Sequence, residues 1–385
     1  MIGLSALVTV AFGTLFYAFS VLITDEAAGA EFSITVLSVA WSGSVLVGGA
    51  VAFLIGRHAD RRGVRGIMAA GAVIGATGLA LVAAAHEPWH VIVASWVFIG
   101  AGGAMTFYEP AFVAIDQWFD ADGRIRSLAM LTVIGGLAGP IFLPLTSILV
   151  SELGWRTTAY VLGLVLLVTG LATTALLFPE HAQVRVASSG PGPEVSLFTL
   201  LKDRRFAYFT AATLLGFAAL QAIIFHRIAL FEEAGFDVTT VAVWASAAGL
   251  LSLPARYAAP YMSRYVTPVL LTAAAFSVLT VAAVFAAVSD ANWHMGAHFV
   301  VFGVAFGALL PLRAVVMSNW FSGPGYGRIM GVQWTIVATS AAAGPLLVGI
   351  VRDAAGSYTV PLAAVAATLA IAAMLSTASG ARSPA

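Results

Sequence analysis

Several ionisable side chains stand inside long apolar stretches of the chain. Glu109 lies within "FYEPAF", Arg313 within "PLRAVV", Arg256 within "SLPAR" and His226 within "IFHRIALF". A charge in hydrocarbon is costly, so residues of this kind usually mark a binding site or a proton path. A carboxylate or an imidazole can take up and release a proton, and a guanidinium offers a planar pair of donors to an anion. The sequence therefore predicts proton transfer and anion binding.

Each of these residues also has a structural interpretation. Glu109 and Arg313 can form a static bridge, and a bridge that breaks during a conformational cycle would serve both purposes. Arg256 stands near the end of its apolar stretch, where a basic residue can simply fix the topology. His226 can be an ordinary histidine at a membrane interface. These alternatives stay open at the level of the sequence.

The composition is that of an integral membrane protein. Of 385 residues, 60% are hydrophobic and 9% are charged, whereas soluble domains carry about 25% charged residues. The formal net charge is zero, so nothing favours a nucleic-acid partner. The chain has no cysteine, and it shows no nucleophile elbow, phosphate loop, dinucleotide fingerprint or metal-ligand spacing. We expect no enzyme activity, no catalytic residue, no cofactor and no metal.

The hydropathy pattern predicts an all-α membrane protein with twelve transmembrane helices, each of the roughly 20 apolar residues that a bilayer requires. We read the first as a retained helix, because no basic region with a cleavage site precedes it. The predicted helices cover residues 2–23, 33–56, 66–86, 89–117, 127–151, 157–178, 206–230, 239–262, 267–288, 296–320, 327–351 and 358–379.

The distribution of basic residues predicts the orientation. With both termini in the cytoplasm, fourteen of the eighteen Lys and Arg residues fall on the inner side, three on the outer side, and Arg313 within a helix. We therefore expect a multi-pass protein of the cell inner (plasma) membrane with both termini cytoplasmic.

A polar linker divides the chain into halves that resemble each other. Residues 179–205 are rich in Ser, Gly and Pro, which predicts an N-terminal bundle over 1–178 and a C-terminal bundle over 206–385. "DQWFDADGRIR" and "SNWFSGPGYGR" place Trp118 and Trp320 at corresponding positions, 202 residues apart. The twelve helices should therefore form two pseudo-symmetric six-helix bundles. Gly303 and Gly307 are predicted to allow close helix packing.

The loop "GRHADRRGVR" resembles the signature loop of the major facilitator superfamily, Gly-x-x-x-Asp-Arg-x-Gly-Arg. Gly56, Asp60, Arg61 and Gly63 match, while the last basic residue comes one place late. The resemblance implies the fold of that superfamily and a gating role for these four residues. Asp60 is expected to stand against the N-terminal dipole of span eleven and to hold the inner gate shut.

A closer resemblance, to the monocarboxylate transporter group and its bacterial relatives, rests on "GTLFYAFSVLI", "WFDADGRIRSLAMLTVIGGLAGP" and "AGPLLVGIVRDAAGSY". In that group an arginine of span eight pairs with the substrate carboxylate, and Arg256 matches it. Ser252 stands where the group has an acid, and span one has no lysine.

Spans one, four, seven and ten line the cavity in the superfamily that the chain resembles. Glu109 lies nine residues before Trp118, and Arg313 lies seven before Trp320, so they should have nearly equal depth on corresponding helices. We expect Arg256 and Arg313 to bind the substrate, with Tyr17 and Tyr108 as hydrogen-bond donors. Glu109 and His226 are the expected proton carriers. Burial disfavours a charged carboxylate and a guanidinium favours it, so anion binding to the arginine would free Glu109 to take a proton.

The sequence thus predicts a secondary active transporter that moves a small organic anion, expected to be a monocarboxylate, with protons by alternating access. The alternative is proton-driven efflux of a drug-like or toxic compound, because "GGLAGP" resembles part of a span-five motif of proton-coupled exporters. A membrane enzyme would need a catalytic cluster, and a sensor would need an additional soluble domain. The expected partners are the organic anion, protons and the lipid bilayer, and the protein is expected to function as a monomer.

Overall fold

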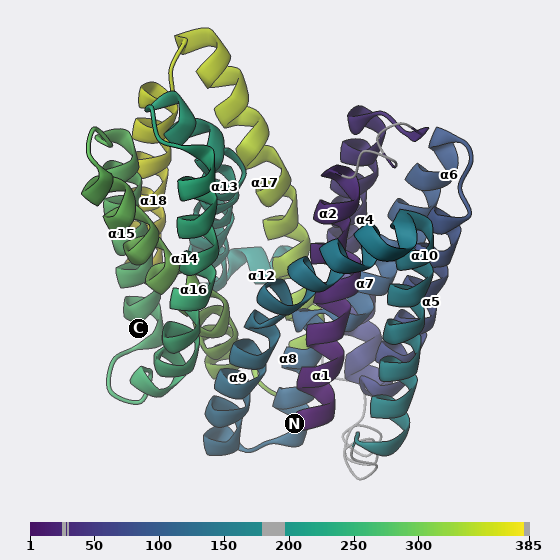
Figure 1. Cartoon of the computed structure of the whole chain (residues 1–385). Helices are drawn as coiled ribbons and strands as arrows, with labels where there is room; N and C mark the ends of the chain where they lie inside the picture. The colour runs from purple at the N-terminus through teal and green to yellow at the C-terminus, as the bar shows by residue number, and fades with distance from the viewer. Residues whose placement is uncertain (25–27, 29–30, 179–196, 381–385) are drawn as a thin grey trace. The chain divides into compact units, whose positions relative to one another are not determined.

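A computed structural model describes residues 1–24, 28, 31–178 and 197–380, and within these ranges every regular element is a helix (Figure 1). The helices are α1 (Ile2–Ala11), η1 (Phe12–Tyr17), α2 (Ala18–Thr24), α4 (Ile34–Arg62), α5 (Arg65–Ala83), α6 (Pro88–Val93), η2 (Ala94–Gly100), α7 (Ala101–Thr106), α8 (Tyr108–Trp118), α9 (Ala121–Gly136), α10 (Ala138–Leu176), α12 (Leu197–Lys202), α13 (Arg204–Glu233), α14 (Val238–Met262), α15 (Pro268–Ala287), α16 (Asn292–Phe321), α17 (Tyr326–Ala355) and α18 (Thr359–Ser379). The elements η1 and η2 are π-helical segments that continue their neighbours.

Ten helical stretches of the described chain are long and apolar enough to cross a membrane. A shorter apolar helix, Ile2–Tyr17, precedes them. One stretch, Ala121–Leu176, covers two predicted spans, and Gly154 inside it has a positive φ of 76° that interrupts the helix. The fold is therefore an assembly of about ten to twelve apolar helices, and the count of twelve in two six-helix bundles stays a prediction.

Span four departs from the predicted uninterrupted helix. It consists of α6, η2, α7 and α8, and Phe107 between α7 and α8 has an extended conformation with φ −78° and ψ −158°. Pro110 lies three residues after this break. Proline has no N–H and its ring collides with the carbonyl of the residue four positions earlier, so it fits best in the first turn of a helix and kinks or breaks a helix elsewhere. The sequence "YEPAF" therefore begins a new helix within the span.

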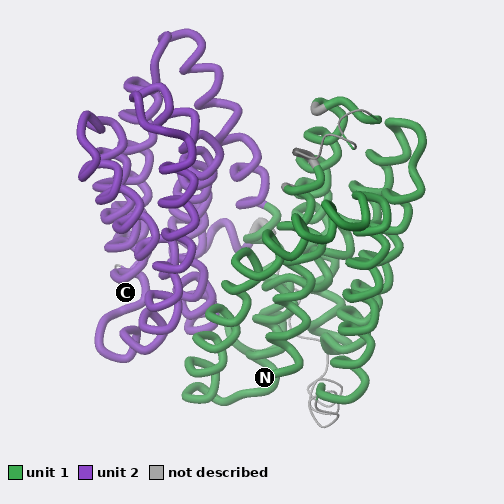
Figure 2. The backbone as a smooth tube through the Cα atoms, viewed as in Figure 1, with its two compact units in different colours: residues 1–194, 321–335 green, residues 195–320, 336–385 purple. Residues whose placement is uncertain are grey.

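The chain forms two compact units (Figure 2). Unit 1 contains Met1–Glu194 and Phe321–Thr335, and unit 2 contains Val195–Trp320 and Ile336–Ala385. Helix α17 thus gives its first ten residues, Tyr326–Thr335, to unit 1 and its remainder to unit 2. Most of the predicted linker, residues 179–196, lies outside the described residues, and the predicted boundaries at 178 and 206 stay predictions.

Small residues allow close helix packing inside each unit. In unit 1, α5 packs along α10, and a Cβ at Gly170 would collide with Ala72. In unit 2, α18 packs on α13 and α15 around a buried cluster that includes Phe276 and Leu279. Lipid gives helices no hydrophobic reason to associate, so van der Waals contact through small residues has to stabilise such interfaces.

Candidate functional site

Glu109 stands at the break in span four. It belongs to the first turn of α8 and is half-buried. The first turn of a helix has N–H groups without intrahelical partners, and its partial positive charge stabilises an anionic group. A half-helix that begins inside a membrane span is a recurring way to accommodate a charge at that depth. The broken helix therefore gives Glu109 a setting that a continuous helix would not provide.

Two tyrosines of unit 1 lie against span five, near the junction of α9 and α10. A Cβ at Gly135 would collide with the hydroxyl of Tyr108, and a Cβ at Gly139 would lie 3.1 Å from the ring of Tyr17. Gly135 lies at the end of α9 and Gly139 at the start of α10, so the two contacts lie on either side of the junction at Leu137. Tyr108 is buried, with 6% exposure, and Tyr17 is half-buried. The glycines of "GGLAGP" thus make room for the two predicted hydrogen-bond donors.

Aromatic rings surround these residues. The ring of Phe12 stacks on Phe107 with centroids 4.1 Å apart and lies 4.9 Å from the ring of Tyr108. Tyr108 in turn stacks on Phe112 at 5.6 Å. Contacts of this kind restrict the ring of Tyr108. The predicted residues of unit 1 therefore lie in an ordered, largely apolar environment.

Arg256 is buried in unit 2 on α14, with 6% exposure. Its Nε donates to the Oγ of Ser252 at 3.3 Å, and its Cζ lies 5.3 Å from the ring centroid of Phe306 on α16. A guanidinium above an aromatic face gains a cation–π contact of about 1 kcal/mol or more when it is removed from water. Ser252, which replaces the acid of the family pattern, thus holds the arginine through a neutral oxygen.

The register of α14 and α16 places Arg313 at a depth similar to that of Arg256. A Cβ at Gly303 would lie 2.6 Å from the carbonyl oxygen of Ala248, and a Cβ at Gly307 would collide with that of Ser252. The predicted packing role of these glycines is confirmed. Both contacts have the same offset of 55 residues, so the helices run parallel and Arg256 is level with Pro311.

Arg313 is two residues further along α16, a rise of about 3 Å, and has 1% exposure. It also lies seven residues after Phe306, on the same helix face. Between Asp237 and Asp353 the only acidic residue is Asp290, which is outside the helices. In the described helices of this part of unit 2, the buried charged side chains are therefore two arginines, Arg256 and Arg313, at similar depth. Glu109 belongs to unit 1 and Arg313 to unit 2, and their pairing stays a prediction.

The signature loop ends α4 and contacts the start of α17, both within unit 1. Asp60 accepts the backbone N–H of Gly327 at 2.7 Å through Oδ1 and that of Arg328 at 2.8 Å through Oδ2. These are N–H groups of the first turn of α17, so the carboxylate stands at the helix N-terminus, as the sequence indicated. Arg61 is exposed.

Glycines explain the fixed spacing of the loop. Gly63 ends α4 with φ 73°, a conformation that favours glycine. A Cβ at Gly56 would collide with the carbonyl oxygen of Gly327, and one at Gly331 would collide with that of Ala52. The two helices therefore touch through backbone, and this contact brings the first turn of α17 within reach of Asp60.

A second carboxylate at this end of unit 1 was missed by sequence reasoning. Asp116 of α8 accepts the N–H of Gly323 at 3.0 Å and lies 3.2 Å from Arg124. The signal was present in the repeat, because Asp116 of "DQWF" corresponds to Ser318 of "SNWF". An acid that occurs in only one of two matched segments indicates a contact that the other segment does not make.

His226 is held by two partners in unit 2. Its Nδ1 lies 3.0 Å from the hydroxyl of Tyr358, and its Nε2 lies 2.9 Å from the carbonyl oxygen of Pro345. Neither partner was predicted, since both are more than 100 residues away in the sequence. The histidine is therefore part of a defined hydrogen-bonded arrangement among α13, α17 and the start of α18.

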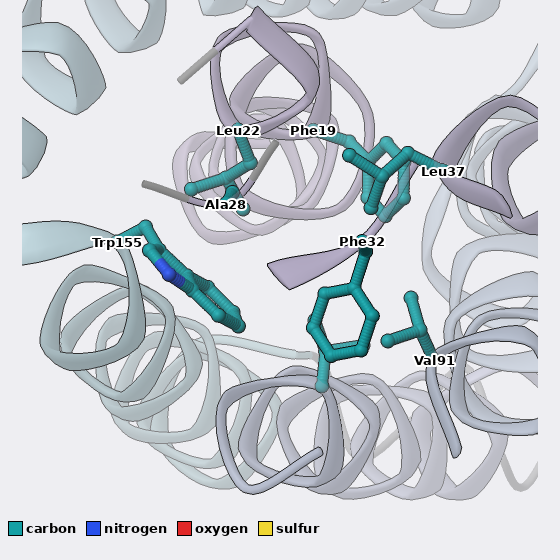
Figure 3. Close-up of a pocket in the computed structure, with 8 residues that line it drawn as sticks. Phe19, Leu22, Ala28, Phe32, Leu37, Val91 and Trp155 are labelled. Carbon is teal, nitrogen blue, oxygen red and sulfur yellow. The ribbon is translucent and has the colours of Figure 1, made fainter. Parts of the chain in front are cut away.

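A small apolar pocket in unit 1 is separate from these residues (Figure 3). It is lined by Phe19, Leu22, Ala28, Phe32, Leu37, Val82, Val91 and Trp155. Among the described residues, no charged side chain lines it. It therefore offers no group that would fix a small anion.

Apolar helices of spanning length with ionisable groups inside them are the features of a multi-pass membrane protein. The sequence matches the Major Facilitator Superfamily over residues 4–306. The chain belongs to this superfamily.

Three proteins show what the chain is similar to. Monocarboxylate transporter 13 of Rattus norvegicus is 28% identical over 309 residues, which are 77% of this chain and 69% of the rat protein. Multidrug resistance protein MdtL of Klebsiella pneumoniae (strain 342) is 26% identical over 227 residues, 58% of this chain and 56% of that protein. The crystal structure of the human organic anion transporter MFSD10 (TETRAN) has a TM-score of 0.73 at 18% identity and covers 97% of each chain, which shows a shared fold.

Proposed function

We propose that the protein is a secondary active transporter that moves a small organic anion, a monocarboxylate, together with protons by alternating access. In this proposal the twelve helices form two six-helix bundles, 1–178 and 206–385, joined by the linker 179–205. Both termini lie in the cytoplasm, the membrane is the inner (plasma) membrane, and the unit of function is the monomer.

The observation that carries the proposal is the pair of buried arginines on α14 and α16. Arg256 and Arg313 lie at similar depth in unit 2, and their exposures are 6% and 1%. Guanidinium groups bind carboxylates through parallel N–H donors, and such bonds are about twice as strong as neutral ones. The similarity to a monocarboxylate transporter supports a carboxylate as the bound group.

Glu109 is the proposed proton carrier. It is half-buried at the start of α8, beside Tyr108, and the two tyrosines supply hydroxyl donors in the same unit. In this proposal, anion binding to the arginines favours uptake of a proton by Glu109, so that substrate and proton are transported together. This coupling is the physical basis for symport.

Uptake into proteoliposomes tests the proposal. The purified protein is reconstituted and an inward pH gradient of one unit is imposed, with a panel of small carboxylates and cationic drugs outside. One proton per anion allows up to about tenfold accumulation, because one pH unit corresponds to ~1.4 kcal/mol. Pyruvate is the reference carboxylate. Arg256→Ala should abolish uptake, whereas Arg264→Ala, which removes an exposed arginine just beyond the same helix, should leave it unchanged.

Glu109→Gln separates coupling from binding. The variant should exchange pyruvate across the membrane but should not accumulate it against the gradient. Accumulation that survives in Glu109→Gln would show that another group carries the proton.

Proton-driven efflux of a drug-like compound is the second candidate, and the similarity to MdtL favours it. The same vesicles distinguish the two functions. Cationic drugs moved against the proton gradient, with no carboxylate uptake, would establish efflux.

A further inference from the structure

His226 has the partners of a site that can hold a proton in unit 2. The imidazole lies between the hydroxyl of Tyr358 and the carbonyl oxygen of Pro345, at 3.0 and 2.9 Å. A carbonyl oxygen only accepts hydrogen bonds, so Nε2 carries a hydrogen and donates it to Pro345. In neutral histidine Nδ1 then has no hydrogen, and the hydroxyl of Tyr358 donates to it.

Protonation of His226 preserves both contacts. The added proton goes to Nδ1, which becomes a donor, and the hydroxyl oxygen of Tyr358 becomes the acceptor after a rotation of its O–H bond. Burial, the largest effect, raises the pKa of the Tyr358 hydroxyl above 10.0. The hydroxyl therefore keeps its own proton over the physiological range and can reverse its direction.

Charged groups around the imidazole belong to the same part of unit 2. Glu233 of α13 accepts from Nη2 of Arg352 at 3.0 Å and, through its other oxygen, from the backbone N–H of Tyr358 at 3.0 Å. The guanidinium of Arg352 lies 5.7 Å from the ring centroid of Tyr358. Asp353 of α17 contacts Arg352 at 3.4 Å. These charged groups pair among themselves next to Tyr358.

Arg227 adjoins His226 in the sequence of α13, and its charge acts on His298 of α16. Gly349 of α17 gives the ring its space, since a Cβ there would lie 3.7 Å from Cε1 of His226. Within the described residues, the charged groups next to the hydrogen-bond partner Tyr358 are therefore Glu233, Arg352 and Asp353.

We propose that His226 and Tyr358 form a proton-binding dyad that senses pH on the outer side and sets the transport rate through α17. The proposal rests on the proposed function and orientation, which place the end of α13 outside the cell.

Helix α17 gives the dyad a route to the rest of the molecule. In unit 2, its residue Pro345 is held by His226, and its residue Arg352 by Glu233. In unit 1, its first turn is held by Asp60, and Thr335 donates to the carbonyl oxygen of Gly49 at 2.7 Å. A change of charge at the dyad therefore acts on a helix that is fastened in both units.

Titration of the histidine tests the proposal without a substrate. The full-length protein in lipid nanodiscs is labelled with [13C]histidine and followed by NMR between pH 5 and 8.5. The chain has seven histidines, and the signal of His226 is the one that disappears in His226→Gln. Glutamine keeps a donor near the position of Nε2 but does not titrate in this range.

Exchange in proteoliposomes tests the effect on transport. Pyruvate exchange is measured in the Glu109→Gln background with only the outer pH varied, so that the coupling proton of the proposed function is absent. A single site changes its protonated fraction about tenfold across two pH units, and the exchange rate should follow this change. His226→Gln should remove the pH step, whereas His294→Gln, at a half-buried histidine elsewhere in unit 2, should retain it.

We expect the NMR signal of His226 to move with pH, and we expect His226→Gln to lose the pH step in the exchange rate. In Tyr358→Phe, the midpoint of the NMR titration and the midpoint of the exchange profile should both change. A signal that stays fixed from pH 5 to 8.5 would overturn the proposal, and so would a pH profile unchanged by His226→Gln. If pyruvate is not exchanged at all, the proposed function fails, and the NMR titration and its shift in Tyr358→Phe still decide whether the dyad binds a proton.

Discussion

Replacement of Asp60 by asparagine should weaken the attachment of α17 to α4. The carboxylate accepts two N–H groups of the first turn of α17, at 2.7 and 2.8 Å. Asparagine has one acceptor oxygen, and its amide N–H₂ faces the second N–H group unfavourably. The substitution also removes the negative charge that the helix N-terminus stabilises.

The size of the effect follows from these contacts. A hydrogen bond to a charged group contributes about 1.5–3 kcal/mol, and Asp60→Asn loses one such bond and weakens the other. A total loss of about 2–4 kcal/mol changes the equilibrium between the state with this contact and states without it by roughly 30- to 1,000-fold. The state held by Asp60 should therefore lose its dominance.

Spin-label distance measurements can follow this equilibrium directly. The chain has no cysteine, so labels attach only to cysteines that are introduced. Gly66 of unit 1 is exposed and a Cβ there meets nothing within 4 Å, and Tyr265 of unit 2 is 88% exposed. Cysteines at these two positions report the distance between the units in nanodiscs.

The matched control is Asp120→Asn. Asp120 is also an acid at a helix N-terminus, but it caps its own helix by accepting the N–H of Gly123 at 2.8 Å. Asp120→Asn should leave the distribution of distances between the two spin labels unchanged. Asp60→Asn should change this distribution and slow pyruvate exchange without altering substrate preference. Equal distributions in the wild type and Asp60→Asn would refute the reasoning, and altered substrate preference would place the loop in the binding site.

Two further predictions concern stability. Gly307→Ala should lower the melting temperature by roughly 1–4 °C through a collision with Ser252 that costs about 1–3 kcal/mol. Gly249→Ala, where a Cβ meets nothing within 4 Å, should not lower it, and equal effects of the two substitutions would reject the α14–α16 register. Hydrogen bonds from the backbone and then the side chain of Thr240 hold the pKa of Asp237 below 3.8, so its stabilising effect is fully present above the unfolded value and disappears as the pH falls through the folded value. Melting temperatures from pH 6 to 3 should therefore fall less steeply in Asp237→Asn, and parallel curves would contradict this.

The sequence was sufficient for the elements whose signals are local. Hydropathy predicted the apolar helices, and the resemblance of the Gly56 to Gly63 pattern to the superfamily's signature loop implied that Asp60 stands against the start of span eleven. Gly303 and Gly307 were predicted as packing residues, since small residues at helical spacing have few other uses in a membrane span.

Features that depend on distant contacts were not predicted. The break at Phe107 was signalled by Pro110, but a hydropathy average over about 20 residues does not detect a single extended residue. The motif "GGLAGP" was related to proton-coupled exporters, and only the structure shows that the side chains beside its Gly135 and Gly139 are Tyr108 and Tyr17. The partners of His226 are joined to it by contacts across 119 and 132 residues, for which a single sequence gives no signal.

Proton movement driven by the substrate tests the central proposal most directly. Proteoliposomes with a pH indicator inside and equal pH on both sides are exposed to an external pyruvate pulse, with protein-free vesicles as the baseline for passive entry. If Glu109 carries a proton with each anion, the lumen should acidify above this baseline in the wild type and remain at the baseline in Glu109→Gln and Arg256→Ala. Pyruvate entry through the wild-type protein without acidification above the baseline would contradict proton-coupled transport.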